Sequence, residues 1–187
     1  GDRRAADPLR ALLRSADPQV AETAAWALGA VAGPEAIESL MAAIDEGAPR
    51  VQAAAIRAID NMREPDPRLL EPFLEALQSP YAVVRAAAAN ALRRYDDERV
   101  VPALAAAFED KDPDVRSRAF MSLSARGGCN DDLFNRALTD SFARVRETVA
   151  RTILSVPNKE RFDAAATLLE DPSVSVRKAA CWGVSLS

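Results

Sequence analysis

The feature that most constrains this chain is a short motif that recurs at a nearly constant interval. Its clearest copy is Asp112-Pro113-Asp114-Val115-Arg116, and the valine of each copy stands at position 20, 51, 84, 115, 145 or 176. Successive valines are therefore separated by 31, 33, 31, 30 and 31 residues. A fixed period of this length is the signature of a solenoid, in which each repeat buries its apolar face against the neighbouring repeats.

Within each repeat the apolar residues follow the period of an α-helix. In the first full repeat they are Val20, Ala24, Ala25 and Leu28, at i, i+4, i+5 and i+8, and later repeats keep these offsets. A turn then follows, and after it a second apolar run. Aromatic residues make up only 5% of the chain, and alanine and leucine fill most apolar positions, which suits closely packed helices better than strands. The pattern predicts two helices per repeat, helix A and helix B.

We therefore expect an all-α fold, a right-handed α-solenoid (superhelix) of about five helix pairs with half-repeats at both ends. The predicted repeats begin near residues 17, 48, 80, 112, 141 and 172, after an N-terminal half-repeat over residues 7–16. Because each repeat contacts only its neighbours, the whole chain, residues 1–187, is expected to form one repeat domain.

The same register predicts details of packing. The residues assigned to the interior include Leu70, Val101, Leu138, Ile153, Phe162, Ala165, Leu169 and Cys181. Asp7 is expected to cap the first helix, with Pro8 in its first turn. Pro72 and Pro102 lie slightly inside their B helices, and they predict irregular helix starts there.

Composition narrows the classes of function. The formal net charge of −4 and the acidic isoelectric point near 5.0 argue against a nucleic-acid binder. No apolar run is long enough to predict a membrane span. Cys129 and Cys181 fall in different layers, too far apart for a disulfide, and they form no Cys-x-x-Cys motif. Two free thiols favour a reducing compartment, and we expect the protein to be cytoplasmic.

The usual residues of an active site are missing from this sequence. It contains no histidine, which removes histidine-based acid–base catalysis, serine–histidine and cysteine–histidine nucleophiles, and histidine metal ligands. Two carboxylate pairs, Asp96-Asp97 and Asp131-Asp132, stand at expected helix starts, where capping of backbone N–H groups explains them. We expect no catalytic residue, no cofactor and no metal site, and hence no enzyme.

Arginine recurs directly after the valine in four repeats, at Arg85, Arg116, Arg146 and Arg177. Aspartate recurs in the turns before the A helices, at Asp17, Asp112 and Asp171. An anion-binding row is one interpretation of the arginines. We favour a structural ladder, in which each guanidinium bridges turn aspartates and helix ends of adjacent layers, because its planar set of donors suits that role.

Two tryptophans occupy the same position of their repeats, six residues after the valine. Other repeats place arginine or asparagine there, so the position is expected at a helix edge or surface. Trp26 is expected to be partly buried against a neighbouring layer, whereas Trp182, in the last helix, is the better candidate for an interface. The last helix is therefore open to end-to-end self-association of this chain.

The alternation of alanine-rich helix A with helix B, the aspartate–proline turns and the valine–arginine helix starts resemble the HEAT-like repeats of the phycobilisome-lyase type. The resemblance covers residues 8–187, although Ala21 and Gln52 replace the arginine and Gly47-Ala48 and Ser79-Pro80 replace the aspartate. It implies a stacked helical architecture. That family includes bilin lyases and scaffolds, so the resemblance leaves the function open.

Helix B lines the concave face in HEAT-type solenoids. When the B helices are aligned on their inward residues, the outward positions carry a row of acidic residues: Glu38, Asp45, Glu71, Glu75, Glu109, Asp163 and Glu170. We therefore expect a protein–protein interaction scaffold or adaptor, with a basic segment as the hypothesis for its partner. A lyase-like or non-catalytic subunit acting on a bilin-carrying protein is the alternative that the resemblance implies. A nucleic-acid binder of the DNA-glycosylase type is a minor alternative.

Overall fold

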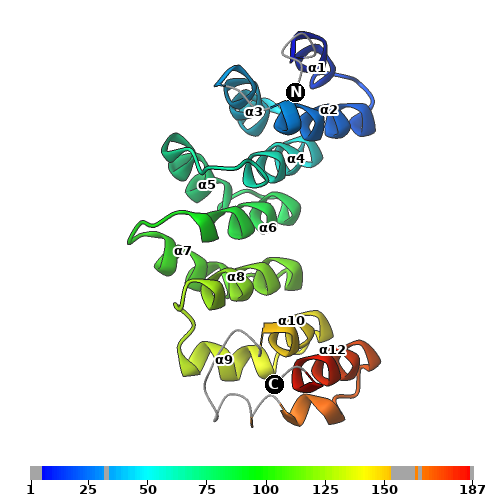
Figure 1. Ribbon diagram of the computed structural model, residues 1–187, viewed down its shortest axis with the longest axis vertical. Coiled ribbons are helices and arrows are strands. Elements are labelled where there is room, and N and C mark those ends of the chain that lie inside the picture. Colours follow the sequence, from blue (N-terminus) through cyan, green and yellow to red (C-terminus); the bar gives the residue numbers. More distant parts are fainter. Residues whose placement is uncertain (1–5, 32–33, 153–162, 164–165, 186–187) are drawn as a thin grey trace. The chain divides into compact units, whose positions relative to one another are not determined.

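The computed structural model describes residues 6–31, 34–152, 163 and 166–185. Over these residues the regular secondary structure is helical, and no strand occurs among them (Figure 1). The prediction of an all-α fold is therefore confirmed. Contacts between residues divide the chain into two compact units, Gly1–Val100 (unit 1) and Val101–Ser187 (unit 2).

Unit 1 alternates A and B helices. They are α1 (Ala6–Leu12), α2 (Pro18–Val31), α3 (Pro34–Glu46), α4 (Pro49–Asp60), α5 (Leu70–Ala76) and α6 (Ala82–Ala91), with 3₁₀ helices at Pro67–Leu69 and Leu92–Arg94. The A helices α2, α4 and α6 lie side by side, and the B helices α1, α3 and α5 pack against members of this row (Figure 1). A Cβ added to Gly29 of α2 would stand 2.8 Å from the Cβ of Ala58, so glycine permits the close approach of α2 and α4.

Unit 2 repeats the arrangement. It holds α7 (Val100–Ala107), which begins at the boundary residue, then α8 (Pro113–Ala125), α9 (Asp131–Leu138), α10 (Ala143–Thr152), the 3₁₀ helix Thr167–Glu170 and α12 (Val174–Ser185). The A helices α8, α10 and α12 form consecutive layers, since α10 packs against both of the others (Figure 1). Each A helix of the chain begins one or two residues after the predicted start of its repeat.

The anchor valines explain why the A helices pack in layers. Val51, Val84, Val115, Val145 and Val176 are all buried, with at most 3% of each residue exposed. Val20 is 36% exposed. Among the described residues no A helix precedes α2, so the side of α2 that carries Val20 lacks the neighbouring layer that covers the later valines.

The predicted phase of the B helices is wrong by one residue in three places. Leu69, Val100 and Leu168 are buried, whereas Leu70 and Val101 are half-buried and Leu169 is exposed. Each buried residue directly precedes the predicted one. In α7, for example, Val100, Leu104 and Phe108 fall at i, i+4 and i+8, and all three are buried. Either residue of each pair would fit a helical period. These segments are short or contain a 3₁₀ helix, and in each of them the earlier residue is the buried one.

Other predicted interior residues have mixed outcomes. Leu138 is half-buried, and Cys181 is exposed although the register placed it inside. Cys129 is buried, and both cysteines are free thiols, as predicted. The predicted interior residues Ile153, Phe162 and Ala165 lie outside the described residues.

Helix starts follow local sequence with two corrections. The segment that contains Pro72 does begin irregularly, with the 3₁₀ helix before α5, whereas α7 begins regularly after a turn and holds Pro102 in its first turn. Asp7 lies inside the first turn of α1 rather than before it. Asp97 accepts the backbone N–H of Arg99 at 2.9 Å, as a cap should.

The second carboxylate pair does not cap its helix. Asn130 caps α9 by accepting the backbone N–H of Leu133 at 2.9 Å. Asp131 and Asp132 lie in the first turn of α9 instead. Negative charge at that position interacts favourably with the helix dipole, so these aspartates still favour the helix start.

Candidate protein-binding surface

The recurrent arginines make a regular set of bonds within unit 2. Arg116 donates Nε and Nη2 to the carboxylate of Asp140, both at 2.8 Å, and Nη1 to the backbone oxygen of Asp110 at 2.8 Å. Arg146 does the same one layer later, with the Asp171 carboxylate at 2.6 and 3.0 Å and the backbone oxygen of Asp140 at 2.6 Å. Each of these arginines therefore ties the turn before its own A helix to the turn before the next.

These ion pairs are shielded from solvent. The side chains of Arg116 and Asp140 are 13% and 9% exposed, and those of Arg146 and Asp171 are 14% and 4% exposed. The hydrogen bonds from Arg146 lower the pKa of Asp171. Burial raises the pKa of Asp140, but the hydrogen bonds from Arg116 and from the Phe142 backbone outweigh it, and the net shift is downward. Both carboxylates are thus held in the ionised state that the arginines require.

The predicted partners in this ladder need a correction. Asp112 does not pair with Arg116; its carboxylate caps α8 by accepting the N–H of Asp114 at 2.9 Å. Asp17 likewise accepts the N–H of Gln19 at 2.9 Å. The aspartate that receives an arginine stands five residues before a valine, as Asp140 does, whereas the capping aspartate stands three before it. The regular register of Asp140 before Val145 could have identified this residue from the sequence.

Arg85 holds the turn before its own helix in the same way. It is 7% exposed, and its Nη1 donates to the backbone oxygen of Ser79 at 2.8 Å. Arg177 likewise donates Nη1 to the backbone oxygen of Asp171 at 2.7 Å. The four arginines therefore hold the turns that precede their helices, which is what a structural ladder requires of them.

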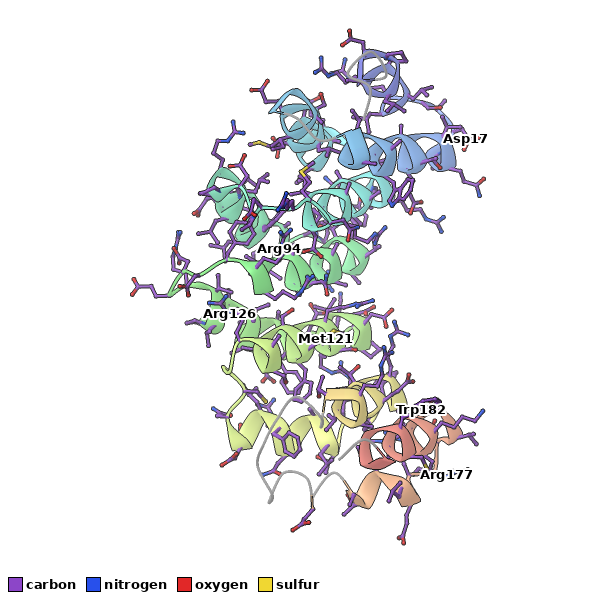
Figure 2. The ribbon with its side chains drawn as sticks, viewed as in Figure 1. Asp17, Arg94, Met121, Arg126, Arg177 and Trp182 are labelled. Carbon is purple, nitrogen blue, oxygen red and sulfur yellow. The ribbon has the colours of Figure 1, made fainter. Side chains whose placement is uncertain are left out.

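Both tryptophans are surface residues. Trp26 is 65% exposed and Trp182 is 72% exposed. The expected partial burial of Trp26 is therefore wrong. Trp182 projects from α12 (Figure 2).

The predicted acidic row lies at the surface, but Arg99 and Arg136 neutralise part of it. All seven carboxylates are exposed. Glu71 accepts a hydrogen bond from Arg99 at 2.8 Å, and Glu109 accepts one from Arg136 at 2.5 Å. Arg99 comes from the turn before α7 rather than from a helix position, so aligning the helices could not place it beside Glu71.

Of the predicted acidic row, the members in unit 1 that bind no arginine are Glu38 and Asp45 on α3 and Glu75 on α5. None of the three makes an ion pair with another described residue, although Glu38 is near enough to Arg68 to interact with it electrostatically. In unit 2, Asp163 and Glu170 are also exposed and make no ion pair with the described part of the chain. The negative field of the helix-B surface is therefore concentrated on α3 and α5 in unit 1.

Unit 1 contains a groove of about 990 Å³, and of those three carboxylates of α3 and α5, Glu38 lines it. Its walls come from α1 and its following turn on one side and from α3 on the other, and its lining includes Leu13, Ala42, Ala43 and Val51 as apolar contacts. Glu38 and Glu46 stand on the α3 wall and Arg10 and Arg14 on the opposite wall. Arg14 and Glu46 approach to 3.8 Å, but both side chains are largely exposed, so this pair contributes little to holding the groove shut.

Two properties of the described residues limit other interpretations. No group of three or more histidine, cysteine, aspartate or glutamate residues among them is placed to hold a metal ion. No helix in the described part of the chain is long and apolar enough to cross a membrane.

Comparison with known proteins agrees with the repeats seen in the structure. The family profile of the HEAT repeats matches residues 1–60 and 70–133. A search of curated protein sequences found no match. The solved complex of CpcE and CpcF of phycocyanin lyase from Nostoc sp. PCC7120 is similar, with a TM-score of 0.70 and 21% identity over 98% of this chain and 77% of that chain.

Two further solved structures are similar over nearly their whole length. A designed armadillo repeat protein in complex with the peptide (KR)4 has a TM-score of 0.55 and 16% identity, covering 95% of this chain and 97% of that chain. An engineered protein has a TM-score of 0.59 and 20% identity, covering 96% and 97%. At these identities the likeness establishes the fold, an α-solenoid of stacked helix pairs.

Proposed function

This chain belongs to the family of HEAT repeat proteins, and from that premise we propose that it is a protein-binding module that recognises a basic segment on the helix-B surface of unit 1. Proteins of stacked helix pairs offer long surfaces to partners rather than a single enclosed pocket. The binding surface that we propose comprises the groove between α1 and α3 together with the exposed carboxylates of α3 and α5.

The observation that carries this proposal is the set of exposed carboxylates on α3 and α5 that make no ion pair within the described part of the chain. Glu38, Asp45 and Glu75 are exposed and make no ion pair with another described residue, and Glu38 also lines a groove of about 990 Å³ that offers apolar contacts. Carboxylates in such a position attract a basic chain, and the groove gives its aliphatic side-chain stems an apolar contact. The designed armadillo protein that holds (KR)4 is a precedent for a basic peptide on this architecture.

The likeness to the phycocyanin lyase subunits supports a shared fold but not a shared reaction. It is a likeness at 21% identity, and the chain contains no histidine for acid–base work. A protein-binding role therefore explains the groove and the exposed carboxylates better than a lyase reaction does.

The test uses a fluorescent octapeptide of alternating lysine and arginine as the probe. The variant Glu38→Lys/Glu75→Lys reverses two carboxylates of the proposed surface. The control Glu64→Lys/Glu98→Lys reverses two exposed carboxylates in turns of the same unit and changes the net charge equally. We expect the first variant to weaken peptide binding by about tenfold, and the control to weaken it far less, because exposed charges act mainly within a Debye length of about 8 Å.

Salt provides a second readout. Binding to the parent protein should weaken steeply as salt increases, and the surface variant should show a flatter dependence. If both variants lose peptide affinity equally, the effect comes from net charge alone. If the surface variant loses no affinity, the peptide binds elsewhere. Either result contradicts the proposed surface.

A further inference from the structure

The groove of unit 1 carries opposite charges on its two walls, and a basic segment matches only one of them. Glu38 and Glu46 line the groove from α3, a helix whose sequence contains no lysine or arginine. Arg10 and Arg14 line it from α1 and the turn that follows α1. A segment that is basic throughout would therefore bring like charges together at the α1 wall, which weakens binding.

Arg14 is the residue of the α1 wall that can most readily bind an anionic group. Its Nη2 lies 3.8 Å from Oε2 of Glu46, and the two side chains are 85% and 74% exposed. Water screens such a pair, so a charged ligand can replace either partner at little cost. Arg10 is less accessible, since its side chain is 35% exposed and Nη1 donates to Asp7 at 3.2 Å.

The negative charge of the other wall continues onto the next B helix. Asp45 on α3 and Glu75 on α5 are exposed and make no ion pair with another described residue. The sequence of α5, like that of α3, contains no lysine or arginine. The B helices of unit 1 follow one another in the order α1, α3, α5 (Figure 1). Along this order the surface charge changes from positive at Arg14 to negative on α3 and α5.

The spacing of the helices determines the spacing of charges on a matching segment. Packed helices lie about 8–10 Å apart, and an extended chain advances by about 3.3 Å per residue. A segment that crosses the groove from α1 to α3 therefore needs about three residues between the group that binds Arg14 and the group that binds Glu38. Leu13 and Ala42 in the lining favour uncharged residues at the intervening positions.

We propose that the partner segment is bipolar: an acidic residue binds Arg14 at the α1 wall, and a basic run that begins about three residues away binds the carboxylates of α3 and α5. This inference rests on the proposed function, because the basic run occupies the surface already proposed for it. It adds a specificity, since the surface selects segments whose acidic and basic residues are separated over segments in which they alternate. Either chain direction can satisfy this order of charges.

Three fluorescent octapeptides test the bipolar specificity. The bipolar peptide is Glu-Glu-Ala-Ala-Lys-Arg-Lys-Arg, in which the nearest acidic and basic residues have the separation required between α1 and α3. The neutral-ended peptide carries glutamine in place of both glutamates. The interleaved peptide has the composition of the bipolar peptide with its acidic and basic residues alternating. Their affinities are measured by fluorescence anisotropy for the parent chain, for Arg14→Gln and for Arg63→Gln.

Arg63→Gln is the matched control, because Arg63 is an exposed arginine in the turn after α4 and does not line the groove. Net charge alone predicts that the two glutamates weaken binding to a chain of net charge −4. We expect the opposite: the parent should bind the bipolar peptide about threefold more tightly than either of the other two. This preference should disappear in Arg14→Gln and remain in Arg63→Gln. It should also fade in about 1 M salt, where the Debye length is about 3 Å.

The results separate this inference from the function on which it rests. If the neutral-ended peptide binds more tightly and its binding still depends on Glu38 and Glu75, the basic-segment function holds and the bipolar specificity is wrong. A preference for the bipolar peptide that survives Arg14→Gln contradicts the inference, because the glutamates then bind elsewhere. Equal affinity for the bipolar and interleaved peptides contradicts it as well. If none of the three peptides binds, the proposed function itself fails, and the bipolar specificity fails with it.

Discussion

At the scale of single residues, the two cysteines stand in opposite surroundings. Cys129 is 8% exposed, whereas Cys181 lies on the open side of α12. A thiol reagent should therefore modify one cysteine per native chain at once and the second only as the protein opens or unfolds. Mass spectrometry of the partly modified protein should place the fast label on Cys181. Fast labelling of Cys129 would contradict the packing of the loop before α9.

Among the arginines of the ladder, we expect the removal of Arg116 to lower the free energy of unfolding most. Arg116→Ala leaves the buried carboxylate of Asp140 without its two guanidinium bonds, and it removes the cation held 5.4 Å from the centre of the Phe142 ring. We expect the free energy of unfolding to fall by about 2–3 kcal/mol, as measured from urea denaturation.

Arg99→Ala is the matched control for that measurement. Arg99 also binds a glutamate, Glu71, but the two side chains are 52% and 62% exposed. A pair so exposed contributes little to the free energy of unfolding. Similar losses in the two variants would show that burial of the Arg116–Asp140 pair adds nothing to its contribution.

At the scale of elements, the sequence was most informative about helix A. The valine anchors predicted the start of each A helix to within one or two residues, because the valine lies at a fixed place in a long, strongly periodic helix. The B helices are shorter, and several begin in a 3₁₀ helix or a turn. Over seven or eight residues, two phases fit the same apolar pattern, which is why Leu70 was assigned to the interior in place of Leu69.

The site was harder to predict than the fold, because its charges come from different kinds of element. Glu71 and Glu109 were correctly expected at the surface, but their arginines approach from other segments, 28 and 27 residues away. The ladder repeats with the chain, so its true register, with the aspartate five residues before the valine, was present in the sequence. Contacts that follow the repeat can be predicted from one chain, whereas contacts between turns and helix surfaces require coordinates.

At the scale of the whole molecule, the two units differ in the residue that stands five before each valine. Unit 1 carries Ser15, Glu46 and Ser79 there, whereas unit 2 carries Asp110, Asp140 and Asp171. Two of these aspartates, Asp140 and Asp171, are buried acceptors of arginines, and their pKa values are lowered. At this position of the repeat, unit 2 therefore depends on ionised carboxylates, whereas the shielded carboxylate of unit 1, Asp60, stands elsewhere in the repeat and pairs with Arg93.

This difference predicts how the protein responds to acid. A carboxylate whose pKa is lower in the folded than in the unfolded state stabilises the fold above the unfolded pKa of about 3.9, and this stabilisation is lost as the pH falls through the folded pKa. The urea midpoint of the parent should exceed that of Asp140→Asn/Asp171→Asn at neutral pH, and the gap should close as the pH falls below about 4. Brief digestion with pepsin near that pH, followed by mass spectrometry, should give the earliest cuts within residues 101–187. A gap that persists in acid, or early cuts confined to residues 1–100, would mean that the buried carboxylates do not control the acid stability of unit 2.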